Sequence, residues 1–203
     1  SNLVALASWL SLNGMEHRSE VVDDDSDQIK RGAASLLSDC DALITSGGAW
    51  TSGRDLVKAA LAGMGLELVF WRVRMGPGKG VAFGLLNNKP VFCLPGGPPS
   101  NEMSFLQLDL PGLLAMSGRR DAALPLQPAF LSGDLAGQAD WTQFWHGSLE
   151  YGTDPQLPPV FHPFEFSGRL KAMADSEAIA SLPEGMRRLE SGSMILVQRL
   201  APC

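Results

Sequence analysis

Three glycine-rich loops, each following an apolar run of strand length, constrain the fold of this chain most strongly. The first loop contains Ser46, Gly47 and Gly48, the second spans residues 77–80 and the third spans residues 95–100. Glycine at a strand end lets backbone N–H groups approach a phosphate closely, and a following helix adds its positive dipole end. Turns also need glycine, so one such loop would be weak support for a ligand site. Three loops in one unit favour it.

Helices and strands are expected to alternate along the first part of the chain. Apolar spacing predicts helices over residues 3–12, 25–37 and 55–63, and strands over 16–22, 42–45 and 66–74. Asp25, three residues before Gln28, is expected to cap the second helix. The last strand would place Arg72 and Arg74 on one face. This alternation is typical of an α/β fold with a parallel-type sheet, in which ligands bind outside the carboxyl ends of the strands.

The pattern changes in the second part of the chain. Asn87-Asn88, between two apolar runs, suggests a hairpin, and a helix is expected around residues 101–116. From residue 119 onward prolines are frequent and helical spacing is lost. We therefore expect an α/β domain over residues 1–118 and a small, mostly β domain over 119–203. A strand is expected upstream of the first helix, because doubly wound domains usually open with a strand.

Composition narrows the class of protein. The 203 residues are 45% hydrophobic and 19% charged, which suffices for a core. No apolar run reaches the roughly 18–20 residues that span a bilayer, so we expect a cytoplasmic protein without membrane contact. A net charge of −6 argues against a nucleic-acid partner. Neither the three cysteines nor the three histidines have the spacing of a zinc site.

Charged residues near the loops suggest an anion site and a cation site. Asp55 ends the first loop, where it could also cap a helix, and Asp24 lies in an acidic run after the expected strand at 16–22. Across a crevice, the two carboxylates could hold Mg²⁺ through oxygen ligands and water. Lys79, which is flanked by glycines, is the stronger candidate to contact an anion, whereas Arg72 could be an ordinary solvated charge.

The loops and the C-terminal tail resemble a known family. The stretches ITSGGAWTSGRD, MGPGKGVAFG and KPVFCLPGGPPS look like the molybdopterin-binding domain shared by the MoeA-type molybdenumtransferases, the gephyrin E domain and the MogA/MoaB adenylyltransferases. The tail SGRLKAMADSEAIASLPEGMRRLESGSMILVQRL is similar to the C-terminal β-barrel domain of the MoeA and gephyrin branch alone. The resemblance implies a three-layer, MogA/MoaB-like α/β domain followed by a small β-barrel-like domain. It also implies a homodimer with the active site near the subunit interface.

The resemblance also implies roles for individual residues. Asp55 matches the family's functional aspartate after the SGG loop, and Asp24 matches an acidic position in its Asp-Asp pair; both are therefore candidates for catalysis and for metal binding. Arg72 falls where the family usually has a lysine that lines the molybdate and phosphate site. The candidate ligand-binding residues are Ser46, Gly47, Gly48, Arg72, Lys79, Pro95, Gly96, Pro98 and Ser100.

Several departures from the family pattern bear on activity. The family's GVSVG-type loop is replaced by a segment that begins with Gly48-Ala49-Trp50, and a family lysine before the PGK motif is replaced by Gly76. The proline that usually follows PGK is Gly80. The family's TGDE loop would lie before Ser1, as would two further domains. The sequence therefore looks like the back half of a longer protein.

The resemblance implies one reaction and leaves two alternatives open. In that reaction adenylylated molybdopterin and molybdate bind together, AMP is hydrolysed off and molybdenum is inserted at the dithiolene. Holding two anions side by side needs Mg²⁺ and cationic or N–H donors against their repulsion. The first alternative is a MogA-like molybdopterin adenylyltransferase, which the β tail argues against. The second is a non-catalytic pterin-binding or scaffold protein, which Gly76 and the altered loop favour.

Replacement of Asp55 by Asn separates catalysis from helix capping. Asn caps a helix about as well as Asp, so Asp55→Asn is expected to melt near the wild-type temperature. The substitution removes the negative charge and most of the attraction for a divalent cation. A catalytic Asp55 therefore predicts a large loss of molybdenum insertion, measured in the full-length protein at limiting Mg²⁺. Full activity of the Asn variant under these conditions would reduce Asp55 to a cap.

Overall fold

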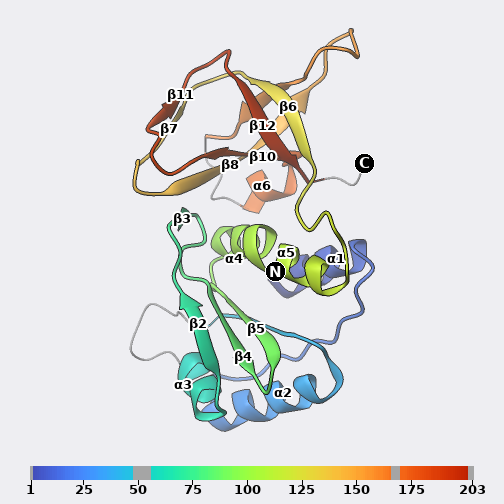
Figure 1. Cartoon of the computed structure of the whole chain (residues 1–203), viewed down its shortest axis with the longest axis vertical. Coiled ribbons are helices and arrows are strands. Elements are labelled where there is room, and N and C mark those ends of the chain that lie inside the picture. The colour runs from blue at the N-terminus through green and yellow to red at the C-terminus, as the bar shows by residue number, and fades with distance from the viewer. Residues whose placement is uncertain (1, 48–55, 166–169, 201–203) are drawn as a thin grey trace. The chain divides into compact units, whose positions relative to one another are not determined.

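The computed structural model describes residues 2–47, 56–165 and 170–200, which form two compact units (Figure 1). The first unit contains Ser1–Val73 and Gly78–Phe105, and the second contains Arg74–Pro77 and Leu106–Cys203. The expected domain boundary at Gly118 stays a prediction. No helix in the described ranges is both long and apolar enough to cross a membrane.

The first unit is built on a four-stranded mixed sheet with the strand order β1-β5-β4-β2. The β1 strand pairs with β5 in parallel, whereas β4 runs antiparallel to both β5 and β2. The α/β class is thus confirmed, although the sheet is less parallel than the alternating pattern suggested. Its elements are α1 (Asn2–Leu12), α2 (Ser26–Asp39), β1 (Leu43–Ser46), α3 (Leu56–Gly63), β2 (Glu67–Trp71), β4 (Ala82–Leu86), β5 (Lys89–Leu94) and α4 (Pro98–Ser104).

The antiparallel part of the sheet comes from the hairpin expected at Asn87-Asn88. Both asparagines have positive φ angles, 51° and 61°, as the two central residues of a type I′ turn require. Asparagine tolerates this region better than most residues, and the turn's twist matches that of the flanking strands. A two-residue turn joins β4 and β5 directly, and such a connection is possible only between antiparallel strands.

One face of the sheet packs against α2 and α3. Leu37 of α2 and Leu61 of α3 meet Val91 and Cys93 of β5 in a buried apolar cluster, so Cys93 is a core residue. On β2, β4 and β5, the rings of Phe70, Phe83 and Phe92 form a chain with centroid distances of 5.7 and 5.0 Å. Apolar side chains of β4 and β5 therefore contribute both to the cluster with α2 and α3 and to the row of phenylalanine rings.

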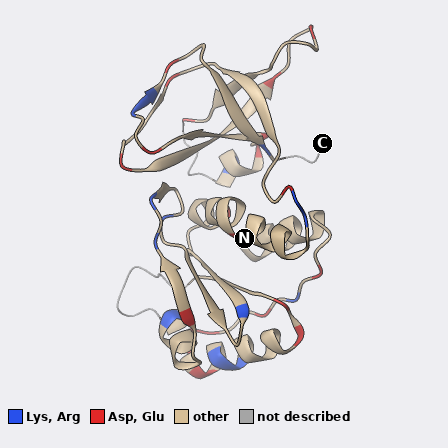
Figure 2. Ribbon diagram, viewed as in Figure 1, with Lys and Arg blue, Asp and Glu red and all other residues tan. Residues whose placement is uncertain are grey.

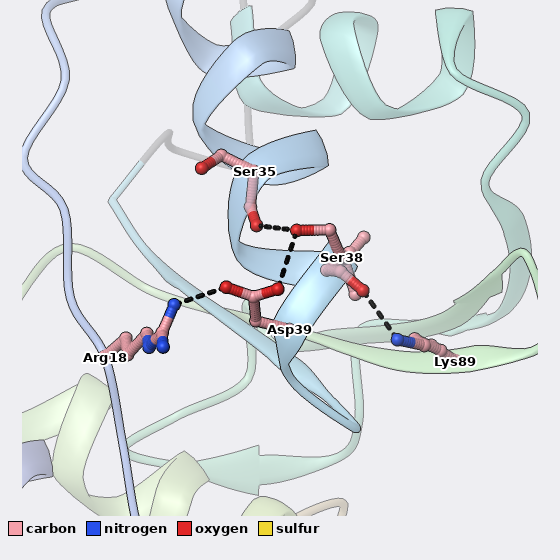
Figure 3. A network of polar contacts seen from close by, with 6 residues as sticks. Arg18, Ser35, Ser38, Asp39 and Lys89 are labelled. Carbon is pink, nitrogen blue, oxygen red and sulfur yellow. Dashed lines mark hydrogen bonds and ion pairs between the residues drawn. The ribbon is translucent and has the colours of Figure 1, made fainter.

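The C-terminal end of α2 is held by charged residues from elsewhere in the first unit (Figure 3). The Lys89 ammonium donates to the carbonyl oxygens of Leu37 and Cys40, at 2.6 and 2.9 Å. Asp39 pairs with Arg18 and accepts a hydrogen bond from the Ser38 hydroxyl. A cation at this end satisfies carbonyls that have no partner within the helix and opposes the negative end of its dipole. Lys89 thereby ties the start of β5 to α2.

Two expectations about the first unit are wrong. Residues 16–22 form no strand, and Val21 is 84% exposed, so the segment has no apolar face to bury in a sheet. The β2 strand ends at Trp71, and Arg72 has a φ of 65°, so Arg72 and Arg74 do not share a strand face. The capping expectation is confirmed, since the Asp25 carboxylate accepts a hydrogen bond of 2.8 Å from the Gln28 N–H.

The second unit contains a closed five-stranded barrel, which confirms the expected β-barrel-like domain. The strands follow the order β10-β12-β6-β9-β8, and β8 pairs again with β10 to close the barrel. A π-helical segment, η1, follows α4 along the chain, and the residues from Leu106 onward belong to this unit. Its elements are β3 (Met75–Gly76), η1 (Phe105–Asp109), α5 (Leu110–Met116), β6 (Leu126–Leu131), β7 (Leu135–Ala136), β8 (Thr142–Glu150), β9 (Val160–Pro163), α6 (Leu170–Ala174), β10 (Ala178–Leu182), β11 (Arg188–Leu189) and β12 (Met194–Arg199).

Small residues allow the barrel strands to pack closely. Ala129, Ala178 and Ala180 are fully buried in the apolar cluster around Phe161. Gly147 of β8 lies against the Phe161 ring, and a Cβ at Gly147 would approach the Cζ atom of that ring to 2.5 Å. No carbon atom fits at this distance, so any side chain at residue 147 must displace β9 or the ring.

Gly147→Ala is therefore expected to lower the free energy of unfolding by about 1–3 kcal/mol, the usual range for overpacking a core. Gly133→Ala is the matched control, because a Cβ at Gly133 meets nothing within 4 Å. The control should lie within about 0.5 kcal/mol of the wild type. Urea unfolding measures both variants, and equal stabilities would show that the contact with Phe161 relaxes without cost.

Asp109, at the end of η1, is a buried carboxylic acid. Its side chain is fully buried, and neither carboxylate oxygen has a hydrogen-bond partner among the described residues. Burial penalises the charged form and raises the pKa of Asp109 well above its ordinary value. Between the unfolded and the folded pKa, the folded state therefore binds more protons than the unfolded chain, and the stability falls as the pH rises through this window.

Asp109→Asn removes this titration, because Asn stays neutral at every pH. Well below about pH 4, the ordinary pKa of an aspartate, Asp109 is protonated in both states, and the unfolding free energies of wild type and variant should differ by a constant amount. Above that pH the wild type is expected to lose stability relative to the variant. Urea unfolding at a series of pH values measures the difference, and a pH-independent difference would contradict the assigned pKa shift.

Candidate functional site

The loops after β1 and β5 leave the same edge of the sheet, side by side. The two strands are parallel neighbours, with Ser46 in register with Leu94. The Gly47 N–H donates to the Leu94 carbonyl over 3.3 Å. A Cβ at Gly96 would lie 3.6 Å from the Cα of Gly47, so both loops present bare backbone to each other. The structure thus brings together Ser46, Gly47 and Gly96, whereas Gly48 lies outside the described residues.

Two asparagines join these loops, and the sequence reasoning missed both as site residues. The Asn101 amide donates to the Ser46 hydroxyl at 3.0 Å and to the Pro95 carbonyl at 2.8 Å. The Asn2 amide donates to the same hydroxyl at 3.1 Å and to the Gly96 carbonyl at 2.9 Å. Asn101 lies three residues before Ser104, so the two share one face of a helix, but this spacing does not mark either residue as part of a site.

Helix α4 also reaches the second glycine-rich loop. Pro98 opens α4, and Ser100 lies in its first turn. The buried Ser104 hydroxyl lies 2.9 Å from the Gly78 carbonyl and 2.7 Å from the Ser100 carbonyl, and it can donate to either. One face of α4 therefore contacts residues from all three loops.

Lys79 and Arg72 lie on neighbouring backbone segments with exposed side chains. The Val73 N–H donates to the Lys79 carbonyl at 3.2 Å, and the Arg72 N–H donates to the Val81 carbonyl at 2.9 Å. The Arg72 guanidinium carbon lies 4.5 Å from the centre of the Trp71 ring, and the Lys58 ammonium lies 4.1 Å from the same ring. Trp71 therefore holds two cations by cation–π attraction, an arrangement the sequence reasoning did not foresee.

The acidic half of the expected site is only partly described. Asp24 is exposed in the segment that precedes α2, and Asp55 lies outside the described residues. Within the described ranges, no group of three or more His, Cys, Asp or Glu side chains could hold a metal ion. Figure 2 shows acidic and basic residues distributed over and around α2 and α3. Asp24 alone does not make a cation site, so no chemical step is assigned to Mg²⁺ here.

Comparisons with known proteins show the family to which this chain belongs. A family model described as probable molybdopterin binding domain matches residues 1–114. A molybdopterin molybdenumtransferase from Haemophilus influenzae is 33% identical over 185 residues, which cover 88% of this chain and 46% of that protein. A second, from Nostoc sp., is 27% identical and covers 98% of this chain and 47% of that protein.

The solved structures include a protein that is similar over both units. A crystal structure of the molybdopterin biosynthesis MoeA protein from Pyrococcus horikosii matches with a TM-score of 0.81 and 25% identity, covering 100% of this chain and 48% of that one. The chain thus spans about half the length of the curated relatives it matches. Because the family model covers more than half of its residues, the chain belongs to the molybdopterin-binding domain family, in a MoeA-like form.

Proposed function

We propose that this chain binds molybdopterin at the edge formed by the loops after β1 and β5 and acts in the insertion of molybdate into adenylylated molybdopterin. The observation that carries the proposal is the convergence of these loops on Ser46, with α4 reaching Gly78 of the second loop. Family membership supports the pterin as ligand. The reaction itself rests on the names of the relatives, each about twice as long as this chain.

The chemistry of the loops suits an anionic ligand on an acidic protein. The net charge of −6 offers no general attraction for phosphate or molybdate, so local donors must supply it. Gly47 and Gly96 leave their backbone uncovered by side chains, which permits the close approach of an oxyanion. Lys79 adds a positive charge beside Gly78, and the Arg72 guanidinium could bind an oxyanion through two parallel hydrogen bonds.

The proposal also includes a homodimer, which the family resemblance implies, and a bound Mg²⁺. Asp24 is an exposed carboxylate that could serve as one oxygen ligand of a hydrated Mg²⁺, with Asp55 as the expected second. When bound, the ion would reduce the repulsion between the two substrate anions. Asp24 and Asp55 would act by orienting it, while Lys79 and the loop backbone hold the oxyanions.

A non-catalytic pterin-binding protein is the second candidate. The specific observation in its favour is Gly76, which stands where the family usually has a lysine. A Cβ at Gly76 would meet nothing within 4 Å, so packing does not require glycine there. This form of the protein would bind molybdopterin with similar affinity but would not convert its adenylylated form in the presence of molybdate and Mg²⁺.

Both candidate functions require the chain to bind molybdopterin, and equilibrium binding of purified molybdopterin tests this requirement. Lys79→Gln is expected to weaken binding about tenfold, because a hydrogen bond to a charged group is worth about 1.5–3 kcal/mol and an exposed lysine realises only part of it. Lys30→Gln is the control, since Lys30 lies on α2 and contacts Asp27 rather than a glycine-rich loop. Absence of binding by the wild type would refute the proposal, and equal losses in both variants would remove Lys79 from the site.

Turnover distinguishes the two candidates. The full-length protein is incubated with adenylylated molybdopterin, molybdate and Mg²⁺, and AMP release is measured alongside incorporation of molybdenum. Both products together support the transferase. Binding without either product supports the non-catalytic protein instead.

A further inference from the structure

The hydroxyl group of Ser46 receives two hydrogen bonds from two different helices. Asn2 of α1 approaches the Ser46 oxygen to 3.1 Å, and Asn101 of α4 approaches it to 3.0 Å. The two asparagines are 99 positions apart in sequence, yet they meet on one oxygen atom at the end of β1. All three residues lie in the first unit.

The direction of both hydrogen bonds follows from the second contact of each amide. The Asn101 nitrogen also lies 2.8 Å from the Pro95 carbonyl, and the Asn2 nitrogen lies 2.9 Å from the Gly96 carbonyl. A backbone carbonyl can only accept, so the group that faces it must be NH₂ and not the amide oxygen. Flipping either amide would place two oxygens in contact. Each NH₂ therefore donates one proton to a carbonyl and the other to Ser46.

This arrangement leaves the Ser46 hydroxyl able only to donate a further hydrogen bond. A hydroxyl has two acceptor lone pairs and one donor proton, and the two amides occupy both lone pairs. Among the described residues, no hydrogen bond is donated by Ser46, whose side chain is exposed at the end of β1. Its proton therefore points away from both amides and has no acceptor among the described residues, so it is available to an acceptor on a ligand.

The burial of Asn101 indicates that the arrangement is rigid. Its side chain is only 2% exposed, and burying an amide costs free energy unless its hydrogen-bonding groups are paired. Both N–H bonds of Asn101 are paired at ordinary distances, so rotating the side chain would break two hydrogen bonds in a buried place. Asn2, at the start of α1, is half-buried and supplies the second constraint on the same oxygen.

We propose that Asn101 and Asn2 are positioning residues that fix Ser46 as a hydrogen-bond donor to an oxyanion of the ligand. This inference rests on the proposed binding of an anionic ligand at the same edge of the sheet. It names the Ser46 hydroxyl as the group that selects the anion, and the two asparagines as the residues that orient this hydroxyl. A serine free to rotate can donate or accept, and so it discriminates little between ligands. Ser46, with both lone pairs occupied, favours a phosphate-type oxygen, which can only accept.

A double-mutant cycle on the whole chain tests the inference, with purified molybdopterin as the probe. Ser46→Ala is expected to weaken binding about tenfold or more, because it removes a hydrogen bond to a charged group. Asn101→Ala should weaken binding about fivefold in the wild-type background and have no effect in the Ser46→Ala background, because it acts through Ser46. A merely structural role would give the same loss in both backgrounds, and that result would overturn the proposal.

Two further variants keep the test decisive. Asn2→Ala removes the second amide from a half-buried place, so it replaces Asn101→Ala in the same cycle if the latter does not fold. Asn13→Ala is the matched control, since the Asn13 amide donates to the Trp9 carbonyl at the C-terminal end of α1. It should leave the affinity for molybdopterin unchanged.

Repeating the cycle with molybdate alone identifies the source of the oxyanion. Coupling between Asn101 and Ser46 with molybdopterin assigns the donor to the phosphate of the pterin. Coupling with molybdate assigns it to the metal oxyanion. Binding by the wild type without coupling for either probe overturns the positioning role and leaves the proposed function intact. Failure of the wild type to bind either probe overturns both.

Discussion

The parallel pairing of β1 with β5 is the constraint on which the rest of the first unit depends. It places the ends of two strands far apart in sequence at one edge, with Ser46 opposite Leu94. The backbone then continues from both strands as glycine-rich loops whose Cα atoms approach without side chains between them. Without this register, the first and third loops would be separate turns that do not meet.

The pairing is maintained at both ends by groups that satisfy buried or helix-terminal carbonyls. At the start of β5, Lys89 binds the last carbonyls of α2 and so fixes the helix relative to the strand. At the other end, Asn101 binds the Pro95 carbonyl and the Ser46 hydroxyl. Because unpaired buried polar groups are costly, these contacts favour one arrangement of the loops over alternatives with similar apolar packing.

Some of the candidate site was open to prediction, and some was not. Ser46, Gly47, Pro95, Gly96, Pro98 and Lys79 lie near strand ends, where a local glycine pattern reveals them. Asn2 and Asn101 have no such pattern, because their role depends on which carbonyls and hydroxyls the fold brings within 3 Å or so. Arg72 was expected on a strand face, but the strand ends one residue earlier and the guanidinium lies against Trp71.

The sequence by itself determined the α/β class, the capped second helix, the hairpin at Asn87-Asn88 and the β character of the C-terminal part. Each of these depends on local rules: apolar spacing, a capping side chain, and residues that tolerate a positive φ. Only the tertiary structure decided that residues 16–22 stay out of the sheet, which strands pair to close the barrel, and that two asparagines meet on Ser46. Those outcomes depend on partners distant in sequence, and a hydrogen bond or a strand pairing exists only when both partners are in place.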